Sequence, residues 1–245
     1  MRGVPWTMHL EGIYNILCAQ GFQNMNRENE SFRNHLVEVM GVMDMSVFIL
    51  GRQTPYFGIW RQHRHGPVNM SKQGDVETVT GLPRSLLDLY SGIGETTSEQ
   101  DLWNWPGEKG NLLQCQLWEA HRLSAILNRA VAHRIEHRHR NPCHAHSQLS
   151  DAILRAHIDM DKEAEENQVV NALNYPALIA AQEVEILRNN PDSMSLIRRC
   201  LQSHSKAGFG SKLLLNLLVE FWEFNDPNLD LDSLASFHHV EAGIL

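Results

Sequence analysis

Residues 113–135 read LQCQLWEAHRLSAILNRAVAHRI. Apolar side chains recur in this stretch at steps of three and four residues, at Leu113, Leu117, Ala120, Leu123, Leu127, Val131 and Ile135. That spacing places them on one face of a helix, while Glu119, Arg122 and Asn128 fall on other faces. The pattern stops at Asn141-Pro142, because a residue before proline disfavours the helical conformation. The stretch predicts one long amphipathic helix.

The same periodicity extends along most of the chain. A second apolar stripe consists of Phe32, Leu36, Val39, Met43, Val47 and Leu50. It predicts a helix that ends at Gly51. Further helices are expected over about 7–20, 83–93, 147–165, 176–189, 193–204 and 211–224. The last of these is apolar almost all round, which predicts the central buried helix.

Two segments, 51–82 and 101–110, are rich in glycine, proline and aromatic residues and are expected to be irregular. Few segments alternate between apolar and polar residues, as a half-buried strand would. The predicted fold class is therefore all-α, an irregular multi-helix array with long loops that contain Gly, Pro and Trp.

Length and composition favour a single domain over residues 1–245. Hydrophobic residues make up 42% of the chain, which is enough for a substantial core. No linker-like Ser/Gly or Pro run divides the chain. The apolar stretches are shorter than the roughly 20 residues that cross a bilayer. The N-terminus also lacks the apolar region of a signal peptide. We expect a soluble intracellular protein with no membrane partner.

The net charge is −8, from 21 Lys and Arg against 29 Asp and Glu. A chain of this charge repels the phosphate backbone, so unaided DNA binding would need a strongly segregated basic face. The four cysteines, Cys18, Cys115, Cys143 and Cys200, are scattered and form no CxxC pair. Their spacing favours a reduced compartment over a disulfide scaffold.

Several short motifs lie within and between the expected helices. They are HLEG (9–12), GRQTP (51–55), TGLPRSLLDL (80–89), WNWPGE (103–108), CQLWEAHRL (115–123), NYPALIAA (174–181) and DLDSLA (230–235). Together they resemble the fungal-specific transcription factor domain, the helical regulatory region of zinc-cluster regulators. The resemblance implies a nuclear, all-α module that regulates transcription of a metabolic or secondary-metabolite biosynthetic gene set through protein contacts.

The chain departs from that family in its cysteines. A zinc cluster needs six thiolates that bridge two zinc ions, and this chain has four cysteines with no short spacing. Direct zinc-cluster DNA binding by this chain is excluded. The expected partner is a DNA-binding or co-regulatory protein, or a second copy; nothing in the sequence supports a small-molecule effector. We also expect earlier helices of the family's region to be missing, as in a fragment, a truncated product or a stand-alone regulator.

One histidine cluster has the residue types of a zinc site. His133, His137, His139, His144, His146 and His157 surround Cys143. His133 and His137 share a helix face, but Glu136 between them does not form the HExxH arrangement of metalloproteases. We favour a solvated helix end here. We assign no catalytic, cofactor-binding or metal-ligating residue.

Two other groups have two interpretations each. Arg61, Gln62, His63, Arg64 and His65 after Trp60 suit nucleic acid, but a solvated loop beside a packed tryptophan is favoured. Trp103, Trp105 and Trp118 could line a groove, but loop anchoring is favoured. The acidic stretch Asp159, Asp161, Glu163, Glu165 and Glu166 is expected to be an exposed helix face.

No GxSxG, P-loop or GxGxxG motif occurs, so a non-enzyme is expected. An inactive remnant and a His-rich metal protein or enzyme are the alternatives.

Overall fold

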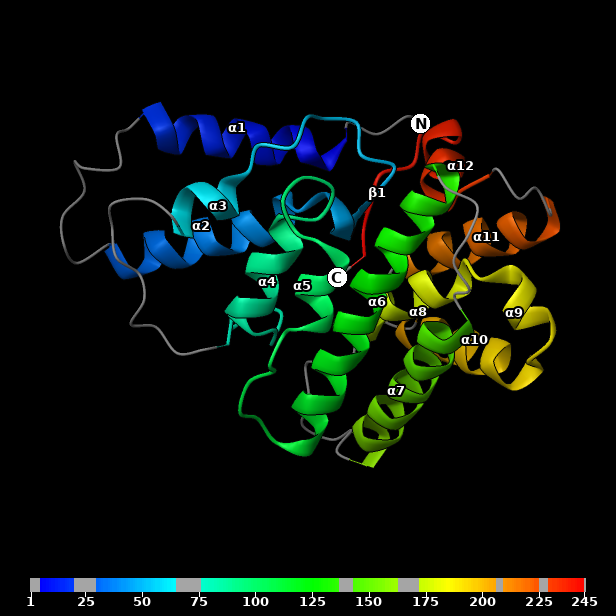
Figure 1. Ribbon diagram of the computed structural model, residues 1–245. Coiled ribbons are helices and arrows are strands. Elements are labelled where there is room, and N and C mark those ends of the chain that lie inside the picture. The colour runs from blue at the N-terminus through cyan, green and yellow to red at the C-terminus, as the bar shows by residue number, and fades with distance from the viewer. Residues whose placement is uncertain are drawn as a thin grey trace. The chain divides into compact units, whose positions relative to one another are not determined.

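A computed structural model describes residues 5–19, 30–64, 76–136, 143–162, 172–205, 209–224 and 229–244. Within these ranges the regular secondary structure is helical apart from one two-stranded sheet, which confirms the all-α prediction (Figure 1). The backbone groups into two compact units. The first comprises Met1–Gly74 and Asp232–Gly243, and the second comprises Asp75–Leu231 and Ile244–Leu245. A single domain stays a prediction.

The first unit is built from both ends of the sequence. Its elements are α1 (Trp6–Ala19), α2 (Glu30–Asp44), a 3-10 turn (Ser46–Phe48), β1 (Ile49–Leu50), α3 (Ile59–Arg64), most of α12 (Leu231–Phe237) and β2 (Ala242–Gly243). Helix α2 packs against α1 and α3 around Leu10, Val37, Met40 and Ile59. Strands β1 and β2 are antiparallel, with Ile49 opposite Gly243. The C-terminal segment is therefore part of the N-terminal unit.

The prediction of a helix continuing to Leu50 is wrong. Helix α2 ends at Asp44, and Met45 has an extended conformation with φ −61° and ψ 120°. The predicted stripe is also not the buried face of α2, because Phe32 and Met43 are exposed whereas Val37, Met40 and Val42 are buried. Past the end of the helix, Phe48, Ile49 and Leu50 are buried. Gly51 does adopt a left-handed φ of 65°, and a Cβ there would lie 2.1 Å from the carbonyl oxygen of Val240. Glycine is thus required at this turn.

The second unit contains the remaining helices. They are α4 (Arg84–Ser91), α5 (Glu99–Trp103), α6 (Leu112–Glu136), α7 (Cys143–Lys162), α8 (Asn174–Ala181), α9 (Val184–Arg188), α10 (Pro191–Ser205) and α11 (Phe209–Phe224). Helix α6 confirms the long helix predicted over 113–135. The helix predicted over 176–189 is divided into α8 and α9. Short helices α3 and α5 occupy parts of the segments expected to be irregular.

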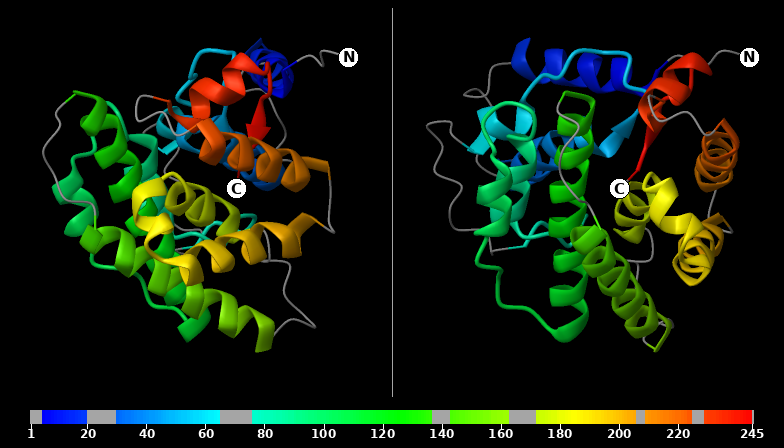
Figure 2. Two further views of the ribbon diagram at one scale, coloured as in Figure 1. Left: turned by 90° about the vertical axis from the view of Figure 1, so that its right-hand side faces the viewer. Right: turned by 45° about the vertical axis from the view of Figure 1, so that its right-hand side comes forward.

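The buried helix of this unit is α8, not α11. All eight residues of α8 are buried, and α8 packs against α6, α7 and α10. Figure 2 shows α7 beside α6, and α10 beside α11. Helix α11 buries one side, including Leu217 and Leu218, and exposes Val219 and Phe224. The prediction that α11 is central is wrong, because alanines such as Ala177 and Ala180 let neighbouring helices approach α8 closely.

Candidate functional site

The histidine cluster falls largely outside the described part of the chain. His133 belongs to α6, and His144, His146 and His157 belong to α7, but their side chains are not among those described. His137 and His139 lie outside the described residues, as do Glu163, Glu165 and Glu166 of the acidic stretch. Asp159 and Asp161 belong to α7. Among the described residues, no group of three or more His, Cys, Asp or Glu is placed to hold a metal ion.

The segment after Trp60 is a helix and not the expected loop. Trp60 is buried, which confirms the packed tryptophan, and Arg61 to Arg64 form the rest of α3. Gln62 donates to the carbonyl of Phe57 at 2.8 Å and accepts from the hydroxyl of Tyr14. His65 lies outside the described residues. Gln62 thereby ties α3 to α1 and to the preceding loop.

The tryptophan of α6 acts as an anchor, as predicted. Trp118 is 1% exposed, and its indole Nε1 donates to the carbonyl oxygen of Gly81 at 2.7 Å. Trp105 is half-buried and donates to the hydroxyl of Ser85 at 3.1 Å. Trp103 donates to Glu99 within its own helix, and the guanidinium of Arg122 lies 5.2 Å from its ring centroid. Two of the three indoles therefore hold one segment against another.

The loop before α4 is organised by a buried carboxylate. Glu77 accepts hydrogen bonds from the backbone N–H of Val79 at 2.9 Å and of Thr80 at 2.7 Å. The Thr80 hydroxyl donates to the same carboxylate at 2.7 Å. Gly81, with φ 70°, ends this turn and presents the carbonyl that Trp118 binds. The motif at 80–89 thus begins with a turn that contacts α6 and continues into α4.

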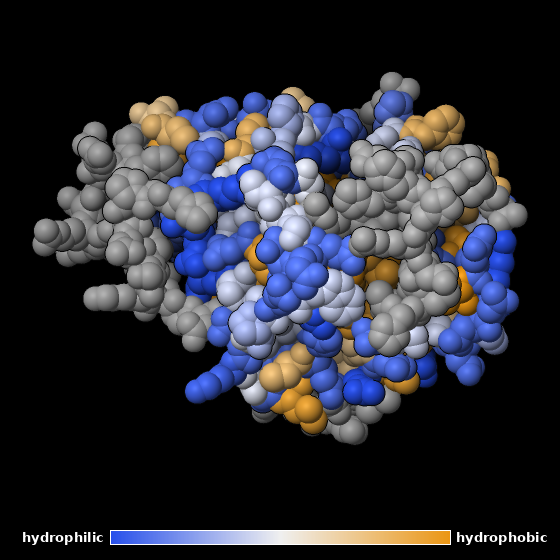
Figure 3. Space-filling view, in the orientation of Figure 1, coloured by the Kyte–Doolittle hydropathy of each residue, from blue (hydrophilic) through white to orange (hydrophobic). Residues whose placement is uncertain are grey.

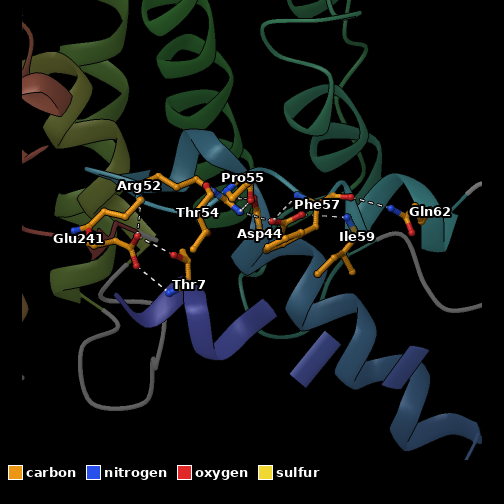
Figure 4. Close-up of polar contacts among 10 residues, drawn as sticks. Thr7, Asp44, Arg52, Thr54, Pro55, Phe57, Ile59, Gln62 and Glu241 are labelled. Atoms are coloured by element: carbon orange, nitrogen blue, oxygen red, sulfur yellow. Dashed lines mark hydrogen bonds and ion pairs between the residues drawn. The ribbon is translucent and has the colours of Figure 1, made fainter. Parts of the chain in front are cut away.

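The first unit holds a buried ion pair (Figure 4). The guanidinium of Arg52 lies 2.7 Å from the Asp44 carboxylate and also donates to the backbone carbonyls of Thr54 and Pro55. The second oxygen of Asp44 accepts from the N–H of Ile59 at 3.1 Å, at the start of α3. The Asp44 carboxylate, at the last residue of α2, therefore accepts from the first residue of α3. It also holds the loop between the two helices, which includes the motif at 51–55.

A second carboxylate joins the C-terminal segment to the N-terminal one (Figure 4). Glu241 accepts from the N–H and the hydroxyl of Thr7, at 2.9 and 2.8 Å, and from the N–H of Gln53 at 2.8 Å. Asp232 accepts from the N–H of Gly51 at 2.7 Å. Because Thr7 lies in the first turn of α1, the Glu241 charge also complements the dipole of that helix.

The core of the second unit contains a buried histidine between two tyrosines. The ring of His121 stacks on Tyr175, with centroids 5.8 Å apart, and the Tyr90 hydroxyl donates to the His121 carbonyl at 2.7 Å. His121 Nε2 lies 2.7 Å from the carbonyl oxygen of Ala172, so Nε2 carries the proton. Nδ1 is left buried without a hydrogen-bond partner among the described residues.

Burial dominates the electrostatics of this cluster. It lowers the pKa of His121 from 6.5 to about 4, although the hydrogen bond to Ala172 acts in the opposite direction. Burial also raises the pKa of Tyr90 well above 10 and raises the pKa of Tyr175. All three groups are neutral at pH 7. Since none is exposed, the arrangement supports packing and not proton transfer to a solute.

Sequence reasoning did not single out Asp44, Glu241 or His121. His121 lies four residues after Leu117 and two before Leu123, so its inward position was implied by the α6 stripe. Asp44 follows directly on the α2 stripe, but its partners are a loop and α3, which periodicity does not locate. No residue pattern around Glu241 indicates its contacts with Thr7 and Gln53.

Comparisons with protein-family models, curated proteins and solved structures found no match for this chain. The resemblance to the fungal-specific transcription factor domain is therefore carried by the sequence motifs. Among the described helices, none combines the length and the apolar character that crossing a membrane requires.

Proposed function

We propose that this chain is a non-enzymatic transcription-regulator module that acts in the nucleus through protein partners. The resemblance of its motifs to the fungal-specific transcription factor domain motivates the proposal. The gene set would be a metabolic or secondary-metabolite biosynthetic one. The partner would supply DNA contact, because the zinc-cluster cysteines are absent from the sequence.

The observation that carries the proposal is that several of the resembling motifs are hydrogen-bonded to one another. Gly81 of one motif accepts from Trp118 of another, and Ser85 accepts from Trp105 of a third. Asp232, near the C-terminus, accepts from Gly51 of the motif at 51–55. These hydrogen bonds fix loops against helices and so hold the surface of the helical scaffold in one conformation. A fold does not by itself imply a function, so these contacts support the proposal only in that the resembling motifs are packed parts of the structure, while the role comes from the resemblance.

Comparing transcripts in cells with and without the chain tests the proposal. Loss of the chain should change a confined set of transcripts, and the wild-type chain should restore them. A matched chain with a nuclear export signal should not restore them. An unchanged transcript set while the folded wild-type chain accumulates would favour an inactive remnant. Equal restoration of the transcripts by the exported chain would contradict the proposed role in the nucleus.

A metal-binding alternative has its own measurement. If Cys143 and the histidines held zinc, purified protein would carry the metal. The double substitution Cys143→Ala, His144→Ala would then release it. Our proposal predicts no stoichiometric metal in the wild-type chain, and a bound zinc ion that the double substitution removes would contradict it.

A further inference from the structure

Helix α1 is attached to the first unit along a narrow face. Of its 14 residues, all of which the structure describes, the buried ones are Thr7 and Leu10. Trp6, Tyr14 and Leu17 pack partly against the same core. The other side of the helix is open to solvent, and in Figure 3 apolar atoms lie along the edge of the molecule where Figure 1 places α1. A helix with few buried apolar contacts opens at a lower free energy than the core beneath it.

The first turn of α1 is capped from the other end of the chain. Pro5 precedes the helix and has no side-chain acceptor, and the first turn contains no acidic residue. The N–H of Thr7 is one of the donors that a helix N-terminus leaves without a partner in its own helix. Glu241 accepts from this N–H and from the Thr7 hydroxyl (Figure 4). A helix of 14 residues with Gly12 in its interior is marginal by itself, so its stability depends on its contacts with the rest of the unit.

Among the described residues, polar side chains hold α1 near each end. Toward the C-terminal end, the Tyr14 hydroxyl donates to the side chain of Gln62, and this contact is neutral and exposed. At the N-terminal end, both donors of Thr7 meet the Glu241 carboxylate, at 2.9 and 2.8 Å, in a partly buried position. Hydrogen bonds to an ionised acceptor are about twice as strong as neutral ones. Glu241 therefore contributes more than Gln62 to the attachment of α1.

The C-terminal segment that supplies Glu241 is held in place without α1. Asp232 accepts from the N–H of Gly51 at 2.7 Å, and β2 pairs with β1. Glu241 itself also accepts from the N–H of Gln53 at 2.8 Å. These contacts join the segment to β1 and to the loop after it, so they persist when α1 moves away. Helix α1 is therefore the side of the Glu241–Thr7 contact that can detach.

We propose that α1 detaches from the first unit in a local opening, and that the contact between Glu241 and Thr7 is a latch that limits how often this happens. Opening uncovers the apolar side chains of α2 and α3 on which Leu10 packs; they are Val37, Met40 and Ile59. The second unit stays folded, because α1 and its latch both belong to the first unit. The two ends of the chain are thereby coupled. This inference does not rest on the proposed function.

Hydrogen exchange of the full chain, measured by mass spectrometry at several urea concentrations, tests the latch. Wild-type α1 amides should be less protected than those of α2 and should depend less on urea, because a local opening exposes little surface. Glu241→Gln should lower the protection of α1 about tenfold, since a neutral acceptor replaces a charged one. The protection of α2 and α8 should not change in this variant.

The matched control is Asp101→Asn in the second unit. Asp101 also accepts from a backbone N–H and a hydroxyl at the start of a helix, those of Ser98 before α5. Its substitution should leave the protection of α1 at the wild-type value. An effect on α1 as large as that of Glu241→Gln would overturn the proposal, because the loss would then not be specific to the latch.

Three other results would overturn the proposal: wild-type α1 and α2 that exchange through one common opening, unchanged α1 protection in Glu241→Gln, or an equal loss of protection in α2. If Glu241→Gln does not fold, Thr7→Val decides. It removes one donor from α1 and keeps the contact between Glu241 and Gln53, so α1 protection should fall about threefold while α2 is unchanged. Wild-type protection of α1 in Thr7→Val would then overturn the proposal.

Discussion

The imidazole of His121 stacks on the phenol of Tyr175, with an angle of 19° between the ring planes. His121 is fully buried, so it can gain a proton only at the cost of burying a charge. This pair lies between α6 and α8, the helix whose residues are all buried. Its protonation state therefore bears on the stability of the second unit.

Stability should fall on acidification because of His121. Its folded-state pKa of about 4 lies below the ordinary 6.5, so the unfolded chain takes up the proton first as pH decreases. The stability that neutral His121 contributes is lost between about pH 6.5 and pH 4, by up to about 3 kcal/mol. His121→Gln retains a donor for Ala172 and does not titrate. Urea unfolding should show a shallower pH dependence for this variant, and an identical slope would contradict the assignment.

Trp118→Phe should destabilise the protein by about 2 kcal/mol or more, because it leaves the Gly81 carbonyl without its donor and opens a cavity. The matched control is Trp103→Phe, which loses a hydrogen bond within its own helix at a half-buried position. That change should cost below about 1 kcal/mol. Chemical denaturation measures both. Equal losses for the two variants would show that the anchoring contact has no special weight.

Asp44→Asn should cost about 3 kcal/mol, since it leaves the Arg52 guanidinium buried without a counter-charge. Glu119→Gln removes a carboxylate 2.6 Å from Arg122, but the Glu119 side chain is 43% exposed whereas that of Asp44 is fully buried, so the loss should be under about 1 kcal/mol. The measured quantity is the difference in the free energy of unfolding lost on removing a fully buried and a partly exposed carboxylate. A cost for Asp44→Asn as small as that for Glu119→Gln would argue against a buried ion pair.

His239→Gly should stabilise the protein by about 0.5–1 kcal/mol. His239, two residues after the end of α12 at Phe237, has φ 56°, and the N–H of Val240 donates to the carbonyl of Ala235 across the end of the helix. Glycine adopts this left-handed conformation without strain. Ser236→Gly, inside the last turn of α12, is the control and should destabilise. A loss of stability for His239→Gly, seen by thermal melting, would contradict the described helix end.

Periodicity predicted the long helices and failed where structure depends on distant partners. Helix α6 matches its stripe because twenty-five residues give many repeats of one face. Helices α3 and α5 are six and five residues long, so they complete fewer than two turns and leave no repeat to detect. The end of α2 at Asp44 depends on Arg52 and Ile59. Those contacts exist only after folding.

The candidate sites were less accessible to sequence reasoning than the helices. Helix α11, which was predicted to be central, has the larger side chains. The fully buried helix is instead α8, whose side chains include several alanines. The anchoring role of Trp118 was predictable from its type and from its place on the α6 stripe. Its partner Gly81, thirty-seven residues away, was not, because no local pattern joins a turn to a helix.

The most direct test of the central claim joins the full chain to an unrelated DNA-binding domain above a reporter gene in the native cell type. If the chain regulates through partners, transcription of the reporter should rise or fall relative to the DNA-binding domain alone. The fusion's level and its occupancy of the reporter site are measured in parallel. Unchanged transcription, with a folded fusion bound at the site, would contradict the account.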